Sequence, residues 1–295
     1  MRRAAFLTLS DPADFVIDDD LAHEPMRRRG WQVDTVPWDM PGIDWRRYEI
    51  AVIRSTWDYQ HRPEEFLATL DRIERFGTRL ENSLDIVRWN MQKTYLRDLA
   101  VRAVATLPTL WRQRLDPGEL LPLFDAMQSE EVVIKPVMSG NAQGAYRLDR
   151  MQARAQVAEI EAYYAARPLM MQPFEPAVVT EGEYSLFYFN GEYSHCVLKV
   201  PKPGDFRVQE EHGGDIRAVT AEPGLCAAGD AVLAAISETL LYARADFVRC
   251  ADGLFRIMEL ELVEPALYLR MDAGAPDRFA DAIVAKATAP ARDTR

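Results

Sequence analysis

Two glutamates near the end of the chain have the spacing of metal ligands on a β-strand. In FRIMELELVEP, residues 255–265, Glu259 and Glu261 alternate with apolar residues, which predicts a strand with both carboxylates on one face. Asp246 lies on the preceding expected strand, and a turn at residues 251–253 would bring it beside them. Three oxygen ligands without histidine or cysteine favour Mg²⁺ or Mn²⁺ over zinc. The alternative is a solvated strand face with ion pairs at its rim.

A lysine and a small-residue loop accompany the apolar strand expected at residues 132–137. Lys135 lies near the end of that strand, and the loop at residues 139–144 contains Gly140 and Gly144. Loop amides with little side-chain bulk can surround phosphate oxygens, while a lysine supplies a mobile positive charge. The lysine precedes the loop, so this is not a Walker motif. A plain turn beside a solvated lysine is the alternative.

Two further segments could contact a nucleotide. In LMMQPFEPA, residues 169–177, the methionines and Phe174 could form an apolar wall, and the amide of Gln172 could face an exocyclic amine. Methionines fill a core as readily as they line a ligand site. The polar loop that begins at Lys199 and includes Arg207 could bring cations opposite the carboxylates. Together, the cations, acids, apolar slot and flexible loop predict Mg-nucleotide binding.

The elements that would position these residues begin with alternating strands and helices. Strands are expected at residues 3–9, 31–38 and 48–55, and helices at 18–30 and 62–77. This alternation predicts a small parallel sheet with helices on its faces. The segment RSTWDYQHR, residues 54–62, follows the third strand, and binding residues gather at such carboxyl ends. No G-x-G-x-x-G follows any strand, which disfavours a dinucleotide site.

The rest of the chain reads as two further groups of elements. A helix capped by Asn90 begins the middle group. A hairpin with an Asn190-Gly191 turn, a strong type I′ signal, begins the last third. The other expected elements are strands at 104–111, 132–137, 145–148, 168–174 and 244–250, and helices at 117–127, 151–165 and 223–241.

Composition narrows the class of protein. The 295 residues are 48% hydrophobic and 27% charged, with 35 basic and 46 acidic residues and a net charge of −11. This balance argues against a nucleic-acid surface. No apolar span is long enough for a transmembrane helix, and the apolar run at residues 4–9 is too short for a signal peptide. Three dispersed cysteines favour a reducing, cytoplasmic location without a disulfide framework.

The order of the motifs resembles that of the ATP-grasp superfamily, from about Asn90 to Leu267. The loop GDFRVQEEHGG is similar to the GDFR…GG loop of ribosomal-protein glutamate ligases and their glutathione synthetase relatives. VIKPVMSGNAQGAY resembles their strand and phosphate loop, MQPFEP their adenine hinge, and IMELE their metal-binding E-x-N. The resemblance implies an α/β (α+β) ATP-grasp fold in three parts. These are an amino-terminal domain at 1–89, a central lid subdomain at 90–170 and a carboxy-terminal antiparallel-sheet domain at 171–295.

The resemblance also implies roles for individual residues, with ATP and Mg²⁺ as cofactors and Mn²⁺ as an alternative metal. The phosphates would contact Lys93, Lys135, Ser139, Gly140, Gln143 and Gly144. The adenosine would contact Gln172, Phe174, Glu183, Met258 and Glu181. The metal would be held by Asp246, Glu259 and Glu261. Lys199 and Arg207 would steady the acyl phosphate and the oxyanion. The acceptor pocket would use Arg54, Ser55, Thr56, Asp58, His212, Gly213 and Gly214.

Three positions depart from the expected pattern. Glu261 replaces the family's asparagine, and Ser185 stands where relatives usually have an arginine that contacts the acceptor. Strict strand alternation would also turn Met258 away from the face of Glu259, so a kink is needed if both serve one nucleotide.

The implied chemistry is activation of a carboxylate by ATP, followed by attack of an amine to form an amide. A small amino-acid-like substrate is expected, without nucleic-acid or membrane partners. One branch of the family closes a ring within one molecule, giving D-cycloserine from O-ureido-D-serine. Alternatives are a glutathione-synthetase-like peptide ligase, a phosphotransferase and a non-catalytic ATP-binding regulator. The oligomeric state is left open, with a homodimer as one option.

Overall fold

The first part of the chain forms a four-stranded parallel sheet. The computed structural model describes residues 1–290 except 14 and 141. Apolar runs form the strands β1 (Arg2–Thr8), β2 (Trp31–Pro37), β3 (Ile50–Ser55) and β4 (Arg79–Glu81), in the order β2-β1-β3-β4. Every residue of β3 is buried, as expected for a central strand covered on both faces. The sheet predicted from the alternating pattern is therefore present, and β4 is an additional short edge strand.

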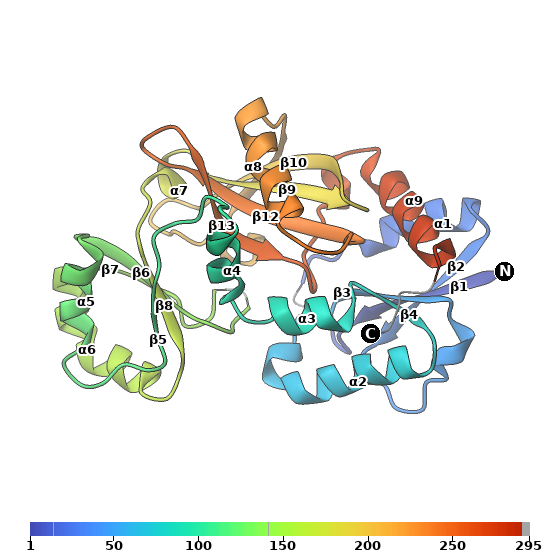
Figure 1. The fold of residues 1–295 in the computed structure, drawn as a ribbon, viewed down its shortest axis with the longest axis horizontal. Coiled ribbons are helices and arrows are strands. Elements are labelled where there is room, and N and C mark those ends of the chain that lie inside the picture. The colour runs from blue at the N-terminus through green and yellow to red at the C-terminus, as the bar shows by residue number, and fades with distance from the viewer. Residues whose placement is uncertain (14, 141, 291–295) are drawn as a thin grey trace.

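Helices cover both faces of this sheet because alternate strand residues point to opposite sides. Phe6 and Val52 pack with α1 (His23–Arg28) and α9 (Ala275–Thr288), whereas Leu7 and Ile53 pack with α2 (Pro63–Arg75) and α3 (Leu84–Asn90). In Figure 1, α9 lies beside α1, although the two helices are far apart in the sequence. The helix α9 thus packs on the first sheet and forms part of the amino-terminal core.

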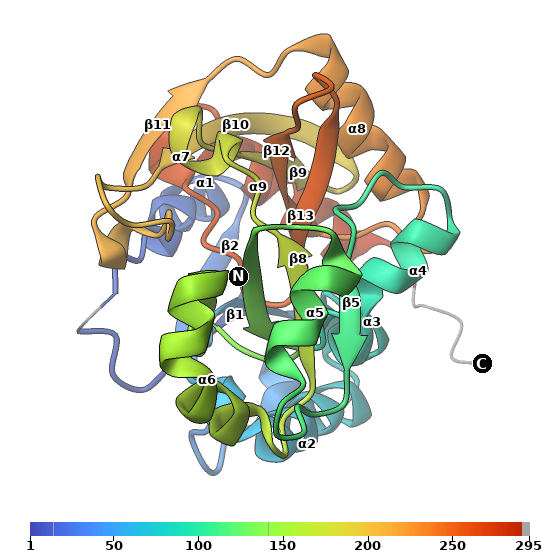
Figure 2. The ribbon, with the colours of Figure 1, turned by 90° about the vertical axis from the view of Figure 1, so that its left-hand side faces the viewer.

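The lid is a separate lobe with its own core. Its strands are β5 (Leu110–Arg112), β6 (Glu131–Pro136), β7 (Tyr146–Asp149) and β8 (Leu169–Pro173), in the order β5-β8-β6-β7. Its helices α5 (Leu120–Met127) and α6 (Arg150–Tyr164) share an apolar cluster with these strands, and Figure 2 shows both helices in front of the sheet. Asp149 and Gln152 form a capping box that starts α6. The expected boundary after residue 170 falls inside β8, so the lid sheet continues to Pro173.

A five-stranded antiparallel sheet links the lid to the amino-terminal part. Its strands are β9 (Glu183–Phe189), β10 (Glu192–Val200), β11 (Asp215–Val219), β12 (Tyr242–Arg249) and β13 (Phe255–Glu261), in the order β11-β10-β9-β12-β13. Asn190 and Gly191 have φ angles of 52° and 83°, as the predicted hairpin turn requires. The remaining helices are α4 (Tyr95–Val101), α7 (Ala177–Thr180) and α8 (Pro223–Ala234). The helix expected at 223–241 therefore ends earlier, at Ala234.

Asn90 has a different role from the one predicted. It ends α3 instead of capping the next helix, and its side chain donates to the carbonyl of Leu260 at 2.9 Å and accepts from the amide of Leu262 at 2.8 Å. Its side chain therefore satisfies backbone groups at the end of β13, the glutamate strand. Ser83 is the N-cap of α3, and its side chain accepts a hydrogen bond from the backbone amide of Ile86.

Candidate active site

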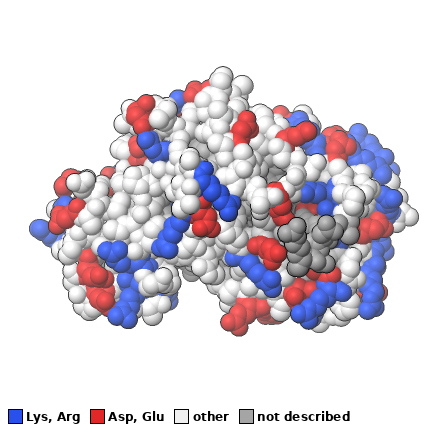
Figure 3. Space-filling view, viewed as in Figure 1, with Lys and Arg blue, Asp and Glu red and all other residues white. Residues whose placement is uncertain are grey.

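A cavity of about 500 Å³ lies where the three parts of the chain meet. Its walls include Lys135 from the lid, Glu259 from β13 and Trp57 from the amino-terminal part. The face shown in Figure 3 is hollowed between the lid and the amino-terminal part, and charges of both signs are interspersed over it. The cavity is large enough for a nucleotide together with a small substrate.

A β-bulge aims the glutamate strand at this cavity. Asp246 of β12 pairs with Glu259, but the next residue, Phe247, pairs with Ile257, so Met258 is an extra residue in β13. Met258 and Glu259 both line the cavity, whereas Ile257 is fully buried. The bulge supplies the kink that strict alternation lacks, and it places a thioether beside the carboxylates.

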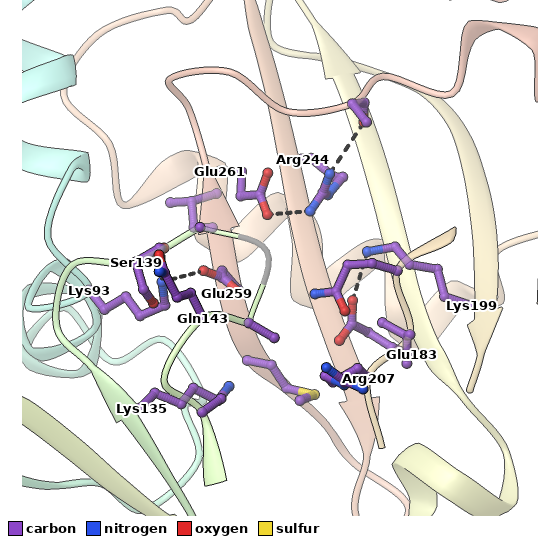
Figure 4. Close-up of a pocket in the computed structure, with 18 of the residues that line it drawn as sticks. Lys93, Lys135, Ser139, Gln143, Glu183, Lys199, Arg207, Arg244, Glu259 and Glu261 are labelled. Atoms are coloured by element: carbon purple, nitrogen blue, oxygen red, sulfur yellow. Dashed lines mark hydrogen bonds and ion pairs between the residues drawn. The ribbon is translucent and has the colours of Figure 1, made fainter. Parts of the chain in front are cut away.

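Lysines from the lid side meet this strand. Lys93 Nζ lies 2.9 Å from the carboxylate of Glu259 and donates to the carbonyl of Ser139 at 3.1 Å. Lys135 points into the cavity without a hydrogen-bond or ion-pair partner among the described residues, as Figure 4 shows. Burial, together with the charge of Lys93, lowers the pKa of Lys135. Lys135 is thus a desolvated cation that an anionic ligand would stabilise.

The two glutamates face the cavity, but the expected metal triad is not assembled. The side chains of Glu259 and Glu261 are 29% and 31% exposed, whereas that of Asp246 is 2% exposed. Asp246 accepts hydrogen bonds from Ser185 at 2.5 Å and from Lys199 at 3.4 Å. The described residues contain no group of three or more His, Cys, Asp or Glu side chains positioned to hold a metal. Only two of the three predicted ligands therefore line the cavity.

The environments of the glutamates differ. Burial opposes ionisation of Glu259, but Lys93 and Lys135 outweigh it and hold the pKa of this carboxyl below its usual range. Burial and the neighbouring charge of Glu259 raise the pKa of Glu261 to about 7, although Arg244 opposes the shift. A divalent cation would favour the ionised form of both groups.

Arg244 is a site residue that the sequence analysis missed. Its guanidinium donates to Asp246 at 3.0 Å, forms an ion pair with Glu261 and lines the cavity. Strand register explains the arrangement, because Arg244 is opposite Glu261 and Asp246 is opposite Glu259 on neighbouring strands. The sequence could have indicated Arg244, because it lies two residues before Asp246 and residues two apart share one face of a strand.

Lys199 and Glu183 form a buried pair on the next two strands. Lys199 Nζ lies 2.7 Å from the carboxylate of Glu183, and both residues line the cavity. Burial raises the pKa of Glu183, and Lys199 opposes that shift. Both predicted residues are therefore at the site, with Lys199 held by carboxylates.

The adenine end predicted from the MQPF segment is an apolar slot. Phe174 shares a cluster with Val133, Val208 and Met258, and the Arg147 guanidinium lies 3.6 Å from the centroid of its ring. The side chain of Gln172 lines the slot and donates to Thr109 Oγ1 at 3.0 Å. Gln172, Phe174 and Met258 are thus brought together as expected.

The small-residue loop covers the cavity as predicted, except at its end. Ser139, Gly140 and Gln143 line the cavity, while Asn141 lies outside the described residues. Gly144 is absent from the lining; it has a φ of 71°, and its carbonyl accepts from Tyr164 Oη at 2.6 Å. A Cβ there would lie 2.3 Å from Tyr163 Oη, so Gly144 anchors the loop to the lid instead of facing a ligand.

The predicted acceptor residues of the amino-terminal part are structural. Arg54 is 1% exposed, pairs with Asp19 at 3.0 Å and donates to the carbonyl of Pro265 at 2.9 Å. Ser55 and Thr56 are also buried, at 2% and 0% exposure. None of these three residues lines the cavity, so the structure does not bring the predicted substrate residues to the site. Arg54 instead joins the sheet to Asp19 and Pro265, and Ser55 shares a hydrogen bond of 2.9 Å with Thr8 on the neighbouring strand.

Asp58 is also turned away from the cavity. It accepts from Trp38 Nε1 at 2.7 Å and pairs with Arg62. The same tip nevertheless reaches the cavity through Trp57, Tyr59, Gln60 and His61. The predicted segment therefore reaches the cavity, and Asp58 is the one residue of the stretch 57–61 that does not line it.

The GDFR…GG loop contributes Arg207 to the cavity. Asp205 pairs with Arg207 at 2.8 Å and accepts from its amide at 3.0 Å, which fixes the loop. His212, Gly213 and Gly214 do not line the cavity, although the neighbouring Glu210 and Glu211 do. A Cβ on Gly214 would lie 2.1 Å from the carbonyl oxygen of Val208, so this glycine permits close backbone packing.

Comparisons with known proteins define the class. The family described as "D-cycloserine synthetase DcsG, N-terminal domain" matches residues 4–82, and "Prokaryotic glutathione synthetase, ATP-grasp domain" matches residues 119–240. The fold and these matches define an ATP-grasp ligase, an ADP-forming enzyme that joins a carboxylate to an amine. The predicted fold class and the predicted enzyme class are both confirmed.

The particular family follows from a relative that spans nearly the whole chain. The cycloserine biosynthesis protein DcsG of Streptomyces lavendulae is 33% identical over an alignment that covers 93% of this chain and 96% of that protein. The chain belongs to the DcsG family of ATP-grasp ligases. A crystal structure of D-cycloserine synthetase DcsG superimposes with a TM-score of 0.83 at 30% identity, covering 97% of this chain and all of that one.

More distant proteins share the fold. D-alanine–D-alanine ligase from Bacillus anthracis superimposes with a TM-score of 0.67 at 11% identity, covering 97% of each chain. A RimK domain protein from Sphaerobacter thermophilus has a TM-score of 0.70 at 16% identity, covering 95% of this chain and 98% of that one. Within the part of the chain that the structure describes, no helix has both the length and the apolar character needed to cross a bilayer.

Proposed function

We propose that this ligase uses Mg-ATP to activate the carboxylate of O-ureido-D-serine and closes the ring of D-cycloserine within the same molecule. One observation carries the proposal. The cavity continues from the apolar slot at Phe174, past Lys135, to a wall built by Trp57 and Gln60 of the amino-terminal part. A relative that matches this chain along nearly its whole length has cycloserine biosynthesis in its name, which supports the same substrate.

The donor set fits a nucleotide with a divalent metal. Lys135 lacks an internal partner among the described residues, and Glu259 and Glu261 present oxygen atoms to the cavity beside it. Two carboxylates combined with phosphate oxygens and water suit Mg²⁺, which is seldom bound by protein ligands alone. When bound, Mg²⁺ would neutralise phosphate charge; Asp246 would support the site through Arg244 and Lys199.

The chain's residues can divide the reaction between them. Lys93 and Lys135 hold the phosphates while the substrate carboxylate attacks the γ-phosphorus, giving an acyl phosphate and ADP. The guanidinium groups of Arg244 and Arg207, which line the cavity, would stabilise the negative charge that develops, a type of stabilisation worth about 10²–10³ in rate per donor. The loop that includes Gly140 keeps water from the acyl phosphate.

Ring closure then follows from the substrate's own chemistry. The ureido nitrogen attached to oxygen attacks the acyl carbon and loses a proton, and inorganic phosphate leaves. The ring nitrogen still carries a carbamoyl group at that point, so one water is required to release it as carbon dioxide and ammonia. The overall reaction forms one amide bond per ATP consumed.

The test is a product analysis with purified protein. O-ureido-D-serine with Mg-ATP should yield ADP, phosphate and D-cycloserine, identified by mass spectrometry against an authentic standard. ADP formation without D-cycloserine would contradict the ring closure. The absence of ADP with this substrate, together with glutathione formation from γ-glutamylcysteine and glycine, would favour the peptide-ligase alternative.

A further inference from the structure

Glu264 is a cavity carboxylate that the catalytic scheme leaves unused. It follows the end of β13 by three residues and lines the cavity beside the amino-terminal tip. Its carboxylate accepts from Gln60 Nε2 at 3.1 Å, and its backbone carbonyl accepts from Trp57 Nε1 at 2.7 Å. Two side chains of the tip therefore fix Glu264 at the end of the cavity away from the adenine slot.

Glu264 differs from several of its neighbours in having no fixed cation. Four other glutamates on the cavity wall have one, in the pairs Glu183–Lys199, Glu210–Arg270, Glu259–Lys93 and Glu261–Arg244. Glu175 and Glu211 also line the cavity and form no ion pair among the described residues. Among the described residues, no ion pair is formed by Glu264, whose only hydrogen-bond donor is the neutral amide of Gln60. A half-buried carboxylate in this position is stabilised when a ligand brings the missing cation.

The carboxylate also lies in a negative environment. Burial and the charges of Glu261 and Glu259 raise the pKa of Glu264 to about 8, opposed by Lys93 and Arg244. A positively charged ligand group would relieve this repulsion.

Gln60 connects Glu264 to the loop that covers the phosphates. The Gln60 amide nitrogen lies 2.8 Å from the position that a Cβ on Gly140 would occupy. Because Gly140 has no side chain, the loop can close directly on Gln60 while Gln60 holds Glu264. The acceptor end and the phosphate loop therefore meet at one side chain.

We infer that Glu264, oriented by Gln60, binds the ammonium group of an amino-acid substrate and so selects amino acids over simple carboxylic acids. The inference rests on the proposed function and specifies one contact that the substrate makes. The carboxylate to be activated must point toward the phosphates and Arg244. A substrate that carries both groups, one for each end of this compartment, is an amino acid.

The test compares two substrates that differ only in the amino group. These are O-ureido-D-serine and its deamino analogue, 3-(ureidooxy)propanoate, each assayed for ADP formation with saturating Mg-ATP. Glu264→Gln, which keeps the size and the contact with Gln60, should lower kcat/KM for the amino substrate by about 100-fold. It should leave the deamino analogue within about threefold and the KM for ATP unchanged.

Two further variants separate recognition from structure. Gln60→Ala removes the orienting amide and should lower the preference for the amino substrate, taken as the ratio of the two kcat/KM values, by about five- to tenfold. Glu211→Gln removes the same charge at the exposed mouth of the cavity and should leave the preference unchanged. Parallel losses for both substrates in Glu264→Gln, or no loss for either, would overturn the inference.

Failure of the proposed function gives a different result. If wild-type protein forms no ADP with O-ureido-D-serine, that substrate assignment fails. The role of Glu264 is then tested by measuring how tightly an amino acid binds. With Mg-ADP present, D-serine should bind wild-type protein at least about tenfold more tightly than it binds Glu264→Gln in calorimetry. Equal affinities would overturn the inference.

Discussion

Lys93 and Lys135 should both hold nucleotide phosphates, but only the removal of Lys93 should lower the stability of the protein. Lys93 already has internal partners, since its ammonium lies 2.9 Å from Glu259 and 3.1 Å from the carbonyl of Ser139. Lys135 has none among the described residues, and burial and the charge of Lys93 lower its pKa. Replacing each by methionine, which keeps most of the side-chain volume, therefore separates ligand binding from internal pairing.

The magnitudes follow from these contacts. A charge-assisted bond to a phosphate contributes about 1.5–3 kcal/mol, so either variant should weaken ATP binding by about 10–150-fold. Lys93→Met leaves Glu259 without its cation, and breaking a fully buried pair costs about 3–5 kcal/mol. Because the two side chains are 12% and 29% exposed, a loss of about 1–3 kcal/mol in the free energy of unfolding is expected. Lys135→Met removes an uncompensated charge, and the free energy of unfolding should stay constant or rise by up to about 1 kcal/mol.

Two measurements on nucleotide-free protein check this prediction. Calorimetry with ATP gives the dissociation constants, and urea unfolding followed by fluorescence gives the stabilities. Both variants should bind ATP more weakly, and only Lys93→Met should unfold at lower urea concentration. Equal destabilisation by the two substitutions, or wild-type ATP affinity in Lys135→Met, would refute the reasoning.

Three further outcomes are expected. Glu259→Gln should lower Mg-dependent ADP formation by about 10²–10³-fold with an unchanged circular dichroism spectrum, and near wild-type turnover would remove Glu259 from the metal site. Gly144→Ala should lower turnover about tenfold, because its Cβ would lie 2.3 Å from Tyr163 Oη, and adding Tyr163→Ala should recover part of the loss. No recovery would show that the positive φ, and not the contact, sets the effect. In metal-free protein, Glu264 binds more protons when folded, because burial raises its pKa from 4.5 to about 8. The free energy of unfolding should therefore fall as the pH rises from about 4.5 to about 8. Glu264→Gln should make this fall smaller in thermal unfolding experiments. Identical pH profiles for the variant and the wild-type protein would contradict the prediction.

The fold was largely predictable because its patterns are strong. Buried β-branched runs such as β3 and the Asn190-Gly191 turn have local causes, and both were found from the sequence. The short strand β4 and the packing of α9 on the first sheet depend on contacts between distant residues, so local patterns did not indicate them. The role of Asn90 also depends on a distant strand, because its side chain pairs with residues after position 259.

Site residues were predictable where an unusual pattern of residue types marks them, and not where the prediction depends on whether a side chain is buried. Lys135 and Glu259 were found because a lysine before a small-residue loop and alternating glutamates are unusual. Arg54 lies outside the cavity lining because an arginine at a strand end can equally be a buried connector, here to Asp19 and the carbonyl of Pro265. The sequence showed that a kink near Met258 was required, but it did not predict the β-bulge itself, because the position of the bulge depends on the register of β12 and β13.

The most direct test of ring closure through an acyl phosphate uses O-ureido-D-serine labelled with ¹⁸O in both carboxylate oxygens. With unlabelled Mg-ATP, one label should appear in the released inorganic phosphate and the other should remain in the carbonyl of D-cycloserine. This result follows because the carboxylate oxygen that attacks phosphorus leaves with the phosphate. Phosphate free of label, with ADP still produced, would mean that water attacks ATP directly and would contradict the account.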